Sequence, residues 1–392
     1  MFSVFSAARK PAARLIAVLS LFWLAACDVT APGAPLATGR PVDPDRPVPV
    51  ALLVPRSSEG ASGVARSLEA AARLAVADLS GVTIDLRVYD TAGSSARAAQ
   101  VAQQAADEGA AVILGPLFGD AANAAAVAVA DDGVTVLSFS NNTSIAGGNL
   151  FVLGPTFENT AERLARYASR QGKRSLVTVH PANVEGQFGR NAIRSAAVSN
   201  GIAVAGEVSF PFTEQGAISA ASQVAQTVRA NDADAVFLTS NSAGALPLLA
   251  QLIPERGIDP EVTQYIGLAR WDVPPQTLEL PGLEGGWFAR PDEALQAQFR
   301  ARYQAANGEA PHPLAGLAYD GIAAIGALAR SGSRDALSPQ SFTRSRGFAG
   351  TGGAFRLRPD GTNERALAVA TIRDRQVVIL DPAPRSFAGA GS

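Results

Sequence analysis

The feature that most constrains this chain is the regular alternation of short apolar segments and helical segments that begins at Val48. Residues 48–54 form a continuous apolar run, which is typical of a strand buried on both faces of a sheet. Residues 62–79 then carry apolar side chains at helical spacing. Because helices separate the strands, successive strands are expected to lie parallel, joined by right-handed crossovers. The sequence therefore predicts an α/β fold with doubly wound parallel sheets.

The alternation occurs twice along the chain. The first run predicts strands at 48–54, 83–89, 112–115 and 135–138 and helices at 62–79, 94–108 and 120–131. The second predicts helices at 156–171, 188–200, 217–231 and 243–253 and strands at 175–180, 203–210, 235–239 and 264–267. Helices at 292–307 and 314–330 follow, then strands at 354–357, 367–373 and 376–380, the last two as a hairpin around Asp374 and Arg375.

Two runs of one kind predict two similar lobes around a cleft, within residues 48–384. The first lobe is expected to comprise about 48–153 plus 289–345, and the second about 154–288 plus 346–381. Residues 385–392 are expected to form a tail, since they are rich in Gly, Ala and Ser.

The N-terminus has the pattern of a bacterial export signal. Basic residues precede an apolar segment, residues 15–26, that is short for a membrane span. The segment ends in Leu24-Ala25-Ala26-Cys27, the pattern of a lipoprotein cleavage site. No other cysteine exists to pair with Cys27 in an oxidising compartment. We expect removal of residues 1–26 and lipidation of Cys27; an ordinary secretory signal with an incidental cysteine is the alternative.

Residues 27–47 are expected to carry the lipid and to act as a proline-rich, extended tether. The acyl chains on Cys27 would attach the protein to a membrane. The expected location is the periplasm, with the anchor in the outer membrane. The inner membrane stays open as an alternative, because Asp28 directly follows the cysteine.

Composition excludes several classes of protein. The chain has 33 basic and 35 acidic residues, so it lacks the basic excess of a nucleic-acid-binding protein. It contains only His180, His312 and Cys27 as zinc-type ligands, and we predict no metal site and no cofactor. There is no Gly-x-Ser-x-Gly motif and no phosphate-binding loop. We therefore predict no catalytic residue and no enzymatic activity, with both histidines at structural or surface positions.

Candidate binding residues lie in loops that follow predicted strands, because open α/β sheets bind ligands beyond the carboxyl ends of their strands. They are Arg56, Ser57, Ser58, Ser138, Ser140, Asn141, Asn142, Ser240, Asn241, Arg270 and Trp271. Each group has a structural alternative. Ser57 or Ser58 fits a helix cap, and residues 138–143 fit a polar turn. Residues 270–272 fit either a recognition cluster or an internal Arg–Asp pair with tryptophan packing.

Several short motifs resemble those of known proteins. The segments that resemble type I periplasmic binding proteins of the leucine-binding kind are Leu52-Leu53-Val54-Pro55, Tyr89-Asp90-Thr91, Gly115-Pro116-Leu117 and Ala318-Tyr319-Asp320. Those that resemble penicillin-binding protein activator lipoproteins (the LpoA type) are Ser138-Phe139-Ser140-Asn141, Gly285-Gly286-Trp287-Phe288-Ala289 and Gly347-Phe348-Ala349-Gly350. The resemblance implies a two-lobed, non-catalytic lipoprotein. Its partner would be a class A penicillin-binding protein, a bifunctional peptidoglycan synthase that it binds and stimulates.

The alternative function is that of a solute-binding protein in an ABC-type uptake system for amino acids or amides. Leucine-type binders hold the ligand carboxylate with small hydroxyl donors and the ammonium with an acid. At the corresponding loops this chain has Phe118-Gly119-Asp120-Ala121 and Leu268-Ala269-Arg270-Trp271. A buried ammonium without a carboxylate partner is unfavourable. A free amino acid is therefore disfavoured, while a different small-molecule ligand stays open.

Overall fold

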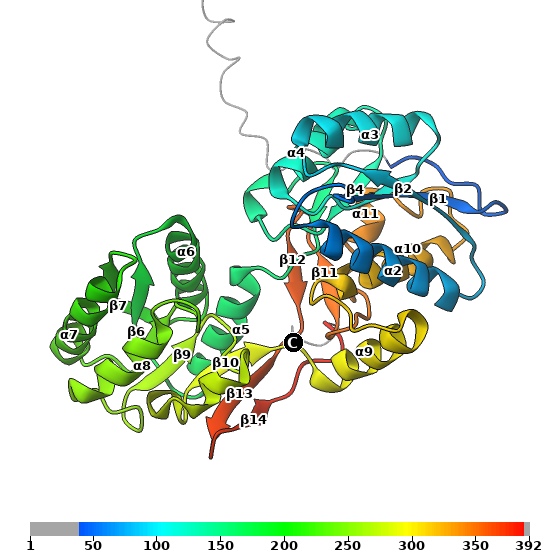
Figure 1. Ribbon diagram of the computed structural model, residues 1–392. Coiled ribbons are helices and arrows are strands. Elements are labelled where there is room, and N and C mark those ends of the chain that lie inside the picture. Colours follow the sequence, from blue (N-terminus) through cyan, green and yellow to red (C-terminus); the bar gives the residue numbers. More distant parts are fainter. Residues whose placement is uncertain (1–38, 388–392) are drawn as a thin grey trace, which may run out of the picture. The chain divides into compact units, whose positions relative to one another are not determined.

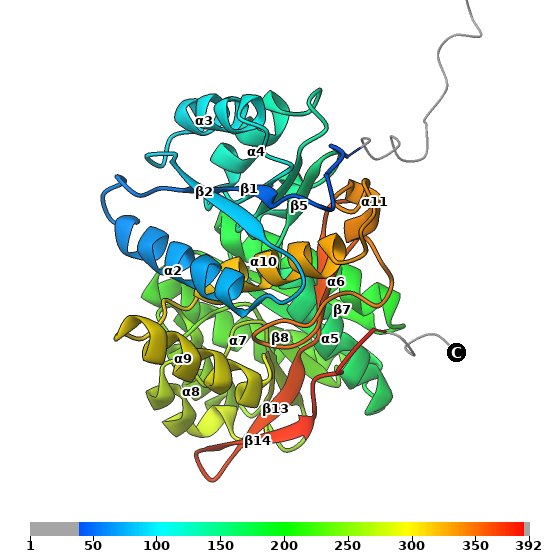
Figure 2. The ribbon, with the colours of Figure 1, turned by 90° about the vertical axis from the view of Figure 1, so that its right-hand side faces the viewer.

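The computed structural model describes residues 39–387, which belong to one compact unit, residues 36–392. The export signal, Cys27 and the first part of the tether lie outside the described residues. The described chain contains two α/β lobes, each built on its own sheet (Figures 1 and 2). This is the predicted fold class. None of the helices within residues 39–387 is long and apolar enough to cross a membrane.

Lobe 1 is built on a five-stranded parallel sheet in the order β2-β1-β3-β4-β5. Its strands are β1 (Val48–Val54), β2 (Ile84–Asp90), β3 (Val112–Leu114), β4 (Thr135–Ser138) and β5 (Leu150–Val152). One face is covered by α2 (Ser62–Asp78), α9 (Glu293–Asn307), α10 (Ala315–Ala329) and the short α11 (Pro339–Phe342). The other face is covered by α3 (Ser95–Asp107) and α4 (Gly119–Ala128). Figure 1 shows α3 and α4 above this sheet and α2 and α10 below it.

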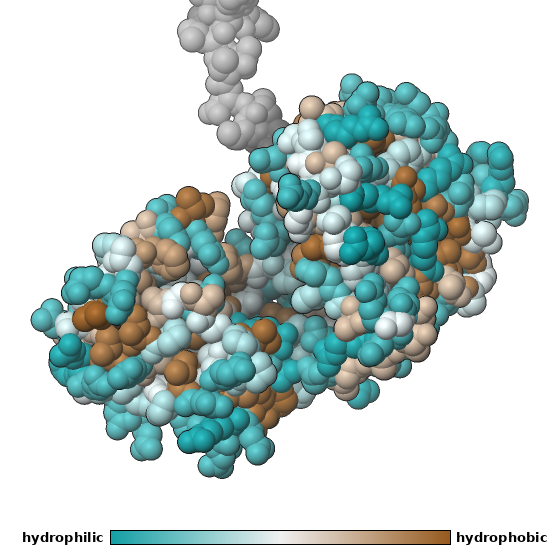
Figure 3. Space-filling model, viewed as in Figure 1, coloured by the Kyte–Doolittle hydropathy of each residue, from teal (hydrophilic) through white to brown (hydrophobic). Residues whose placement is uncertain are grey.

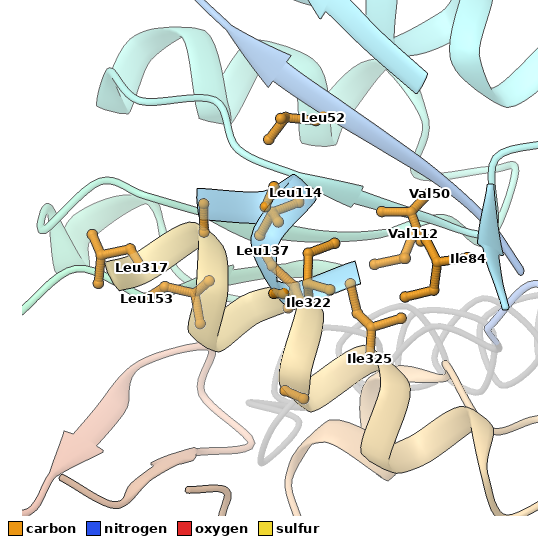
Figure 4. Close-up of a cluster of buried hydrophobic side chains, with 14 of the residues drawn as sticks. Val50, Leu52, Ile84, Val112, Leu114, Leu137, Leu153, Leu317, Ile322 and Ile325 are labelled. Carbon is orange, nitrogen blue, oxygen red and sulfur yellow. The ribbon is translucent and has the colours of Figure 1, made fainter. Parts of the chain in front are cut away.

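The apolar run of β1 explains why this sheet forms. Val50, Leu52 and Val54 point into the cluster with α2 and α10, whereas Ala51 and Leu53 point into the cluster with α3 and α4. Alternate side chains of a strand face opposite sides, so a strand buried on both faces must be apolar throughout. Figure 4 shows Leu52 in the first cluster, together with Ile322 of α10. Burial of each such side chain contributes roughly 1.5–3 kcal/mol.

Lobe 2 is built on a seven-stranded sheet in the order β14-β13-β10-β9-β8-β6-β7. The strands from β6 to β10 are parallel, and β13 and β14 add as antiparallel edge strands. The strands are β6 (Ser175–Pro181), β7 (Ala203–Phe210), β8 (Ala235–Leu238), β9 (Gln264–Gly267), β10 (Trp287–Arg290), β13 (Ala368–Arg373) and β14 (Gln376–Asp381). Helices α5 (Phe157–Arg170) and α6 (Val184–Ser199) cover one face, and α7 (Glu214–Asn231) and α8 (Leu246–Glu255) cover the other.

The predicted hairpin around Asp374 and Arg375 is confirmed. Both residues have positive φ, 51° and 61°, and β13 and β14 pair on either side of them. Two central residues with positive φ match the twist of the flanking strands, which is the geometry of a tight two-residue turn.

Two helices begin earlier than predicted, because polar caps extend them. Helix α6 begins at Val184 rather than 188, with the Asn183 side chain accepting from the Gly186 N–H. Helix α7 begins at Glu214 rather than 217, with the Thr213 hydroxyl accepting from the Gly216 N–H. A side-chain oxygen at the cap satisfies an otherwise unpaired backbone N–H of the first turn.

The boundary between the lobes differs from the prediction after residue 345. The small hairpin of β11 (Phe355–Leu357) and β12 (Asn363–Arg365) belongs to lobe 1, since Phe348, Phe355 and Leu357 lie in its core. Residues 346–365 therefore stay with lobe 1, and the chain re-enters the lobe 2 sheet at β13. The boundary near 289 shifts to Arg290, because β10 pairs with β9 and β13.

The last part of the predicted tether is docked on lobe 1. Val42 is buried in the lobe 1 core, and the Arg40 N–H donates to the Gly133 carbonyl at 2.8 Å. The Arg40 guanidinium also donates to the Ala106 carbonyl at 2.6 Å. The prediction of a free tether up to residue 47 is wrong for this part, because one apolar side chain and one arginine attach it. Residues 27–38 lie outside the described range.

Candidate functional site

The loops after β1, β2 and β3 meet at the carboxyl edge of the lobe 1 sheet. A Cβ atom placed on Gly93 would lie 2.8 Å from the Ser58 hydroxyl and 3.5 Å from the Phe118 ring. Gly93 has φ of 72°, so glycine suits this position for its backbone as well as for space. Three predicted loops therefore converge, as expected from the order of their strands. The Phe118 side chain is 41% exposed at this point.

The loop after β1 is held by Asp90 at the end of β2. The Asp90 carboxylate accepts from the N–H groups of Ser57 at 3.3 Å and Ala92 at 2.9 Å. Burial raises the pKa of Asp90, but these hydrogen bonds outweigh it and leave the pKa below its usual value. Arg56 is exposed and lies 3.5 Å from Glu69. Helix α2 has no side-chain cap, so capping is not the role of Ser57 or Ser58.

The polar segment after β4 is held by hydrogen bonds within the segment and to the loop after β3. The Ser138 hydroxyl donates to the Pro116 carbonyl and accepts from the Ser140 N–H, each at 3.0 Å. The Ser140 hydroxyl accepts from the Asn142 N–H at 3.1 Å, and the Asn142 side chain accepts from the Ser144 N–H at 3.0 Å. These side chains form the polar turn that was one of the two interpretations. Asn141 is exposed.

In lobe 2, the loop after β8 holds Ser240 and Asn241. The Asn241 side-chain oxygen accepts from the Ala243 N–H at 3.1 Å and shapes the turn before α8. Ser240 differs, because its side chain is buried and its hydroxyl has no hydrogen-bond partner. An unpaired buried hydroxyl is unusual in native proteins. Ser240 is therefore a candidate for a ligand contact.

Residues 270–272 form an internal pair with tryptophan packing. Arg270 donates twice to Asp272, at 2.8 and 2.6 Å, and Arg290 lies 3.3 Å from the same carboxylate. Burial raises the pKa of Asp272, but the hydrogen bonds and charge of Arg270 and the charge of Arg290 outweigh it, so the pKa is lowered. The Trp271 side chain is fully buried in the lobe 2 core against Gly267 and Gly286. It is therefore part of the core rather than of an accessible surface.

Both histidines are held by hydrogen bonds within the chain. His180 lies 3.2 Å from the Glu207 carboxylate and 3.0 Å from the Pro181 carbonyl, and Glu207 also pairs with arginines of α6. His312 accepts from the Leu314 N–H at 3.2 Å. Over residues 39–387, no group of three or more His, Cys, Asp or Glu side chains could hold a metal ion.

One cavity lies away from these loops, between α5, α6 and β12. It measures about 320 Å³, and Pro384 and Phe387 border it. Its arginines are already paired: Arg163 with Asp381, Arg166 with Glu162 and Arg358 with Glu364. We therefore assign this cavity to the packing of the C-terminal segment rather than to a ligand.

A set of apolar side chains at these edges is exposed, which the sequence pattern does not predict. Exposed side chains that follow strands are Phe118 in lobe 1 and Val184, Phe188, Phe212 and Val273 in lobe 2. Apolar residues are expected in the core, so their apolar pattern alone gives no sign of this exposure. One signal was present, since Phe212 stands between Pro211 and the helix cap Thr213. Figure 3 shows hydrophobic residues on the surface of the part that carries α6, α7 and α8.

A sequence model of periplasmic binding proteins matches residues 47–376. The chain belongs to the periplasmic binding protein family. Its two α/β lobes are those of the type I, leucine-binding-like fold, and membership of this family indicates a periplasmic location. No curated protein matches this periplasmic binding protein in sequence.

Solved structures share the fold at low sequence identity. A putative branched-chain amino acid ABC transporter protein from Rhodospirillum rubrum is 19% identical, with a TM-score of 0.73, and the match covers 86% of this chain and 100% of that one. The leucine-binding protein from Thermotoga maritima is 19% identical with a TM-score of 0.54, over 85% and 97%. A solute-binding protein from Rhodopseudomonas palustris, in complex with benzoate, is 17% identical with a TM-score of 0.54, over 87% and 97%. These similarities establish the fold.

Proposed function

We propose that this protein is the solute-binding component of an ABC-type uptake system. The observation that carries this proposal is the match of the binding-protein family over residues 47–376, together with the loops that converge at the carboxyl edge of the lobe 1 sheet. Structural neighbours over the full domain are ABC-transporter binding proteins. The protein acts by binding, without chemistry of its own.

The solute function is tested by thermal unfolding of residues 36–392 with a panel of candidate solutes. A ligand that binds only the folded state raises stability by about 2.7 kcal/mol at a hundred times its Kd. We expect at least one solute class to raise the melting temperature in a saturable way. A broad panel of amino acids, amides, peptides and organic acids that leaves the melting temperature unchanged would count against uptake.

A second function is favoured by the polar side chains of the candidate site. Ser138, Ser140 and Asn142 are bonded within the chain, and the Asp272 carboxylate is held by two arginines. These are the groups that a polar solute would need. Because these groups are bonded within the chain, we also consider the function implied by the motifs that resemble penicillin-binding protein activators. In this second proposal, the protein binds and stimulates a class A penicillin-binding protein. Titration of such a synthase with residues 36–392 would give a saturable increase in glycan polymerisation or cross-linking.

We also propose that Cys27 is lipidated and that the lipid anchors the protein to the outer membrane. The signal-like segment ending at Cys27 supports this proposal. In the full chain, Cys27→Ser should remove the acyl mass from the mature protein and release it from the membrane fraction. Density separation of the two membranes tests the outer-membrane location against the inner-membrane alternative raised by Asp28.

A further inference from the structure

We propose that residues 382–387 form a strap between the two lobes, that this strap limits the motion of lobe 2 against lobe 1, and that the contact of Phe387 with Arg356 is its releasable end. The inference concerns how the lobes are held together. It therefore goes beyond the proposed functions and does not depend on which solute or partner is bound. It is based on the contacts at either end of the strap and on the cavity beneath it.

The strap begins on lobe 2, where β14 ends at Asp381. The Asp381 carboxylate lies 3.0 Å from the Arg163 guanidinium and also pairs with Arg170, both of α5. The Arg163 guanidinium donates in addition to the carbonyls of Asp381 and Pro382, at 3.3 and 3.5 Å. Arg163 is only 8% exposed, and an ion pair that is mostly removed from water is screened less than a surface pair. The first residue of the strap is therefore attached to α5 by several contacts.

The strap ends on lobe 1, at the hairpin of β11 and β12. The Arg356 guanidinium carbon lies over the Phe387 ring, 4.8 Å from its centroid, which is the geometry of a cation–π contact. Arg356 is part of β11, and its guanidinium donates twice to Glu364 of β12, at 2.8 and 2.6 Å. These bonds fix the guanidinium against which the ring packs. Residues 385–387, the first part of the expected tail, therefore end on lobe 1.

Between its two ends the strap is stiff and largely exposed. Pro382 and Pro384 fix their own backbone φ, and each restricts the residue before it to extended conformations. Within the described chain, residues 383–386 take part in no hydrogen bond or ion pair. A proline-rich segment acts as a semi-rigid spacer, so a strap fixed at both ends passes a displacement of one end to the other.

The cavity between α5, α6 and β12 lies beneath the strap. It is lined by Pro384, Ser386 and Phe387 of the strap, by α5 and α6 of lobe 2, and by residues 363–367, which lead from lobe 1 into lobe 2. Its volume of about 320 Å³ is on the order of ten times the share of one water molecule in the liquid. The two lobes are therefore not packed directly against each other here, and this space leaves room for one lobe to move relative to the other.

Arg163 connects the strap to a segment that joins the lobes. Its Nε donates at 2.6 Å to the carbonyl of Leu367, between β12 and β13. One buried guanidinium therefore holds both the start of the strap and a place where the chain passes from lobe 1 to lobe 2. Rotation of the lobes about this segment changes the distance from Asp381 to the lobe 1 hairpin. The strap resists that rotation as long as Phe387 stays on Arg356.

The lobe 1 end is the weaker of the two ends. The lobe 2 end combines ion pairs with hydrogen bonds to two carbonyls, whereas the lobe 1 end is a single ring contact. A cation–π contact at a partly exposed position favours the attached state by a factor of about two to five. Release at Phe387 therefore leaves the lobe 2 end in place, and the strap limits lobe motion reversibly.

Distance measurements between two spin labels on residues 36–392, without added solute, test this inference. These residues contain no cysteine, so Val127→Cys on α4 and Gln226→Cys on α7 place one label on each lobe, at exposed positions. Removal of residues 382–392 should broaden the distribution of label distances, because the lobes then sample more orientations. Circular dichroism of each variant controls for folding.

Point variants test the ring contact in the same labelled protein. Phe387→Ala should raise the population of the broadened component about two- to fivefold. Phe387→Tyr keeps an aromatic ring and should leave the distribution unchanged. The matched control is Arg385→Ala, because Arg385 is an exposed residue of the strap without a hydrogen bond or ion pair in the described chain. It should also leave the distribution unchanged.

Three outcomes would overturn the inference. An unchanged distribution after removal of residues 382–392 would show that this segment is a passive tail. Broadening on that removal but not in Phe387→Ala would show that the strap does not end at Arg356. Broadening in Arg385→Ala as large as that in Phe387→Ala would also refute the role of the ring. None of these outcomes bears on the solute function, which the thermal panel tests separately.

Discussion

Arg365 and Asp320 form an ion pair inside the protein, with 3.6 Å between the guanidinium and the carboxylate. Asp320 lies on α10 of lobe 1, and Arg365 ends β12, just before the chain crosses into the lobe 2 sheet. Arg365 also donates to the carbonyl of Leu153, which lies where the chain first leaves lobe 1. The Thr351 N–H donates to Asp320 at 2.7 Å. Arg365 therefore connects two of the segments that join the lobes, and its pair with Asp320 attaches them to α10.

We predict that Asp320→Asn destabilises the protein by about 3–5 kcal/mol, because it leaves the Arg365 charge buried without its partner. Asp335→Asn, at an exposed position, should change stability by less than about 0.5 kcal/mol. Urea unfolding measures both. The double variant Asp320→Asn with Arg365→Met should lose less than the sum of the two single variants. Full additivity would show that the pair makes no specific contribution.

The Asp272 carboxylate should make the protein sensitive to acid. Its pKa is lowered in the folded state, so its stabilising effect is complete above the ordinary aspartate pKa of about 3.9 and is lost as pH falls toward the folded value. Asp272→Asn should reduce stability at neutral pH by about 1–3 kcal/mol and flatten this part of the pH profile. The check is the free energy of unfolding from pH 7 to pH 2.5. An unchanged slope in the variant would assign the acid sensitivity to other carboxyls.

Two buried serines should respond differently to the same substitution. Ser138→Ala removes a hydroxyl with two hydrogen bonds and should destabilise the protein by about 1–2 kcal/mol. Ser240→Ala removes a hydroxyl with no partner and should be neutral or slightly stabilising in the free protein. Melting temperatures of both variants give the comparison. Equal losses would contradict the contrast in their bonding.

Gly267 is required because it packs against Trp271. A Cβ atom at residue 267 would lie 2.2 Å from the indole ring, so Gly267→Ala should destabilise lobe 2 by about 1–3 kcal/mol. Gly201→Ala is a poor control because Gly201 has positive φ. A Cβ atom on Gly63 would meet only the Arg66 guanidinium, at 3.8 Å, and Gly63 does not have a positive φ, so Gly63→Ala is expected to be neutral or stabilising. Near-UV circular dichroism of the tryptophans and chemical unfolding would record the difference.

The long, strongly periodic elements were predictable from the sequence. Strands β1 and β7 have the predicted bounds, as do the shorter β4 and β9, and helices α2, α5 and α9 differ from theirs by one residue at one or both ends. The short strands β5, β10 and β12 were not predicted. Each of them is ordered by its pairing with a neighbouring strand. The antiparallel addition of β13 to β10 likewise depends on residues far apart in the chain.

Some properties of the candidate site could also be predicted from the sequence, and others could not. That the loops after β1, β2 and β3 lie together was predictable, since the carboxyl ends of parallel strands share one edge. The sequence did not show which hydroxyls lack a hydrogen-bond partner within the chain. The Ser138 hydroxyl donates to the Pro116 carbonyl, whereas the Ser240 hydroxyl has no partner. Trp271 is a candidate binding residue in the sequence, with internal packing as the alternative, and it lies in the core between two glycines.

The sequence by itself determined the α/β class, the two-lobed repetition and the order of most elements, because hydrophobic periodicity and turn chemistry are local properties of neighbouring residues. Only the tertiary structure decided the lobe boundary after residue 345, the docking of Val42 and the burial of the Asp320–Arg365 pair. It also decided which apolar residues stay exposed. These properties depend on contacts between distant residues, where burial and hydrogen bonding are settled by the packed chain as a whole.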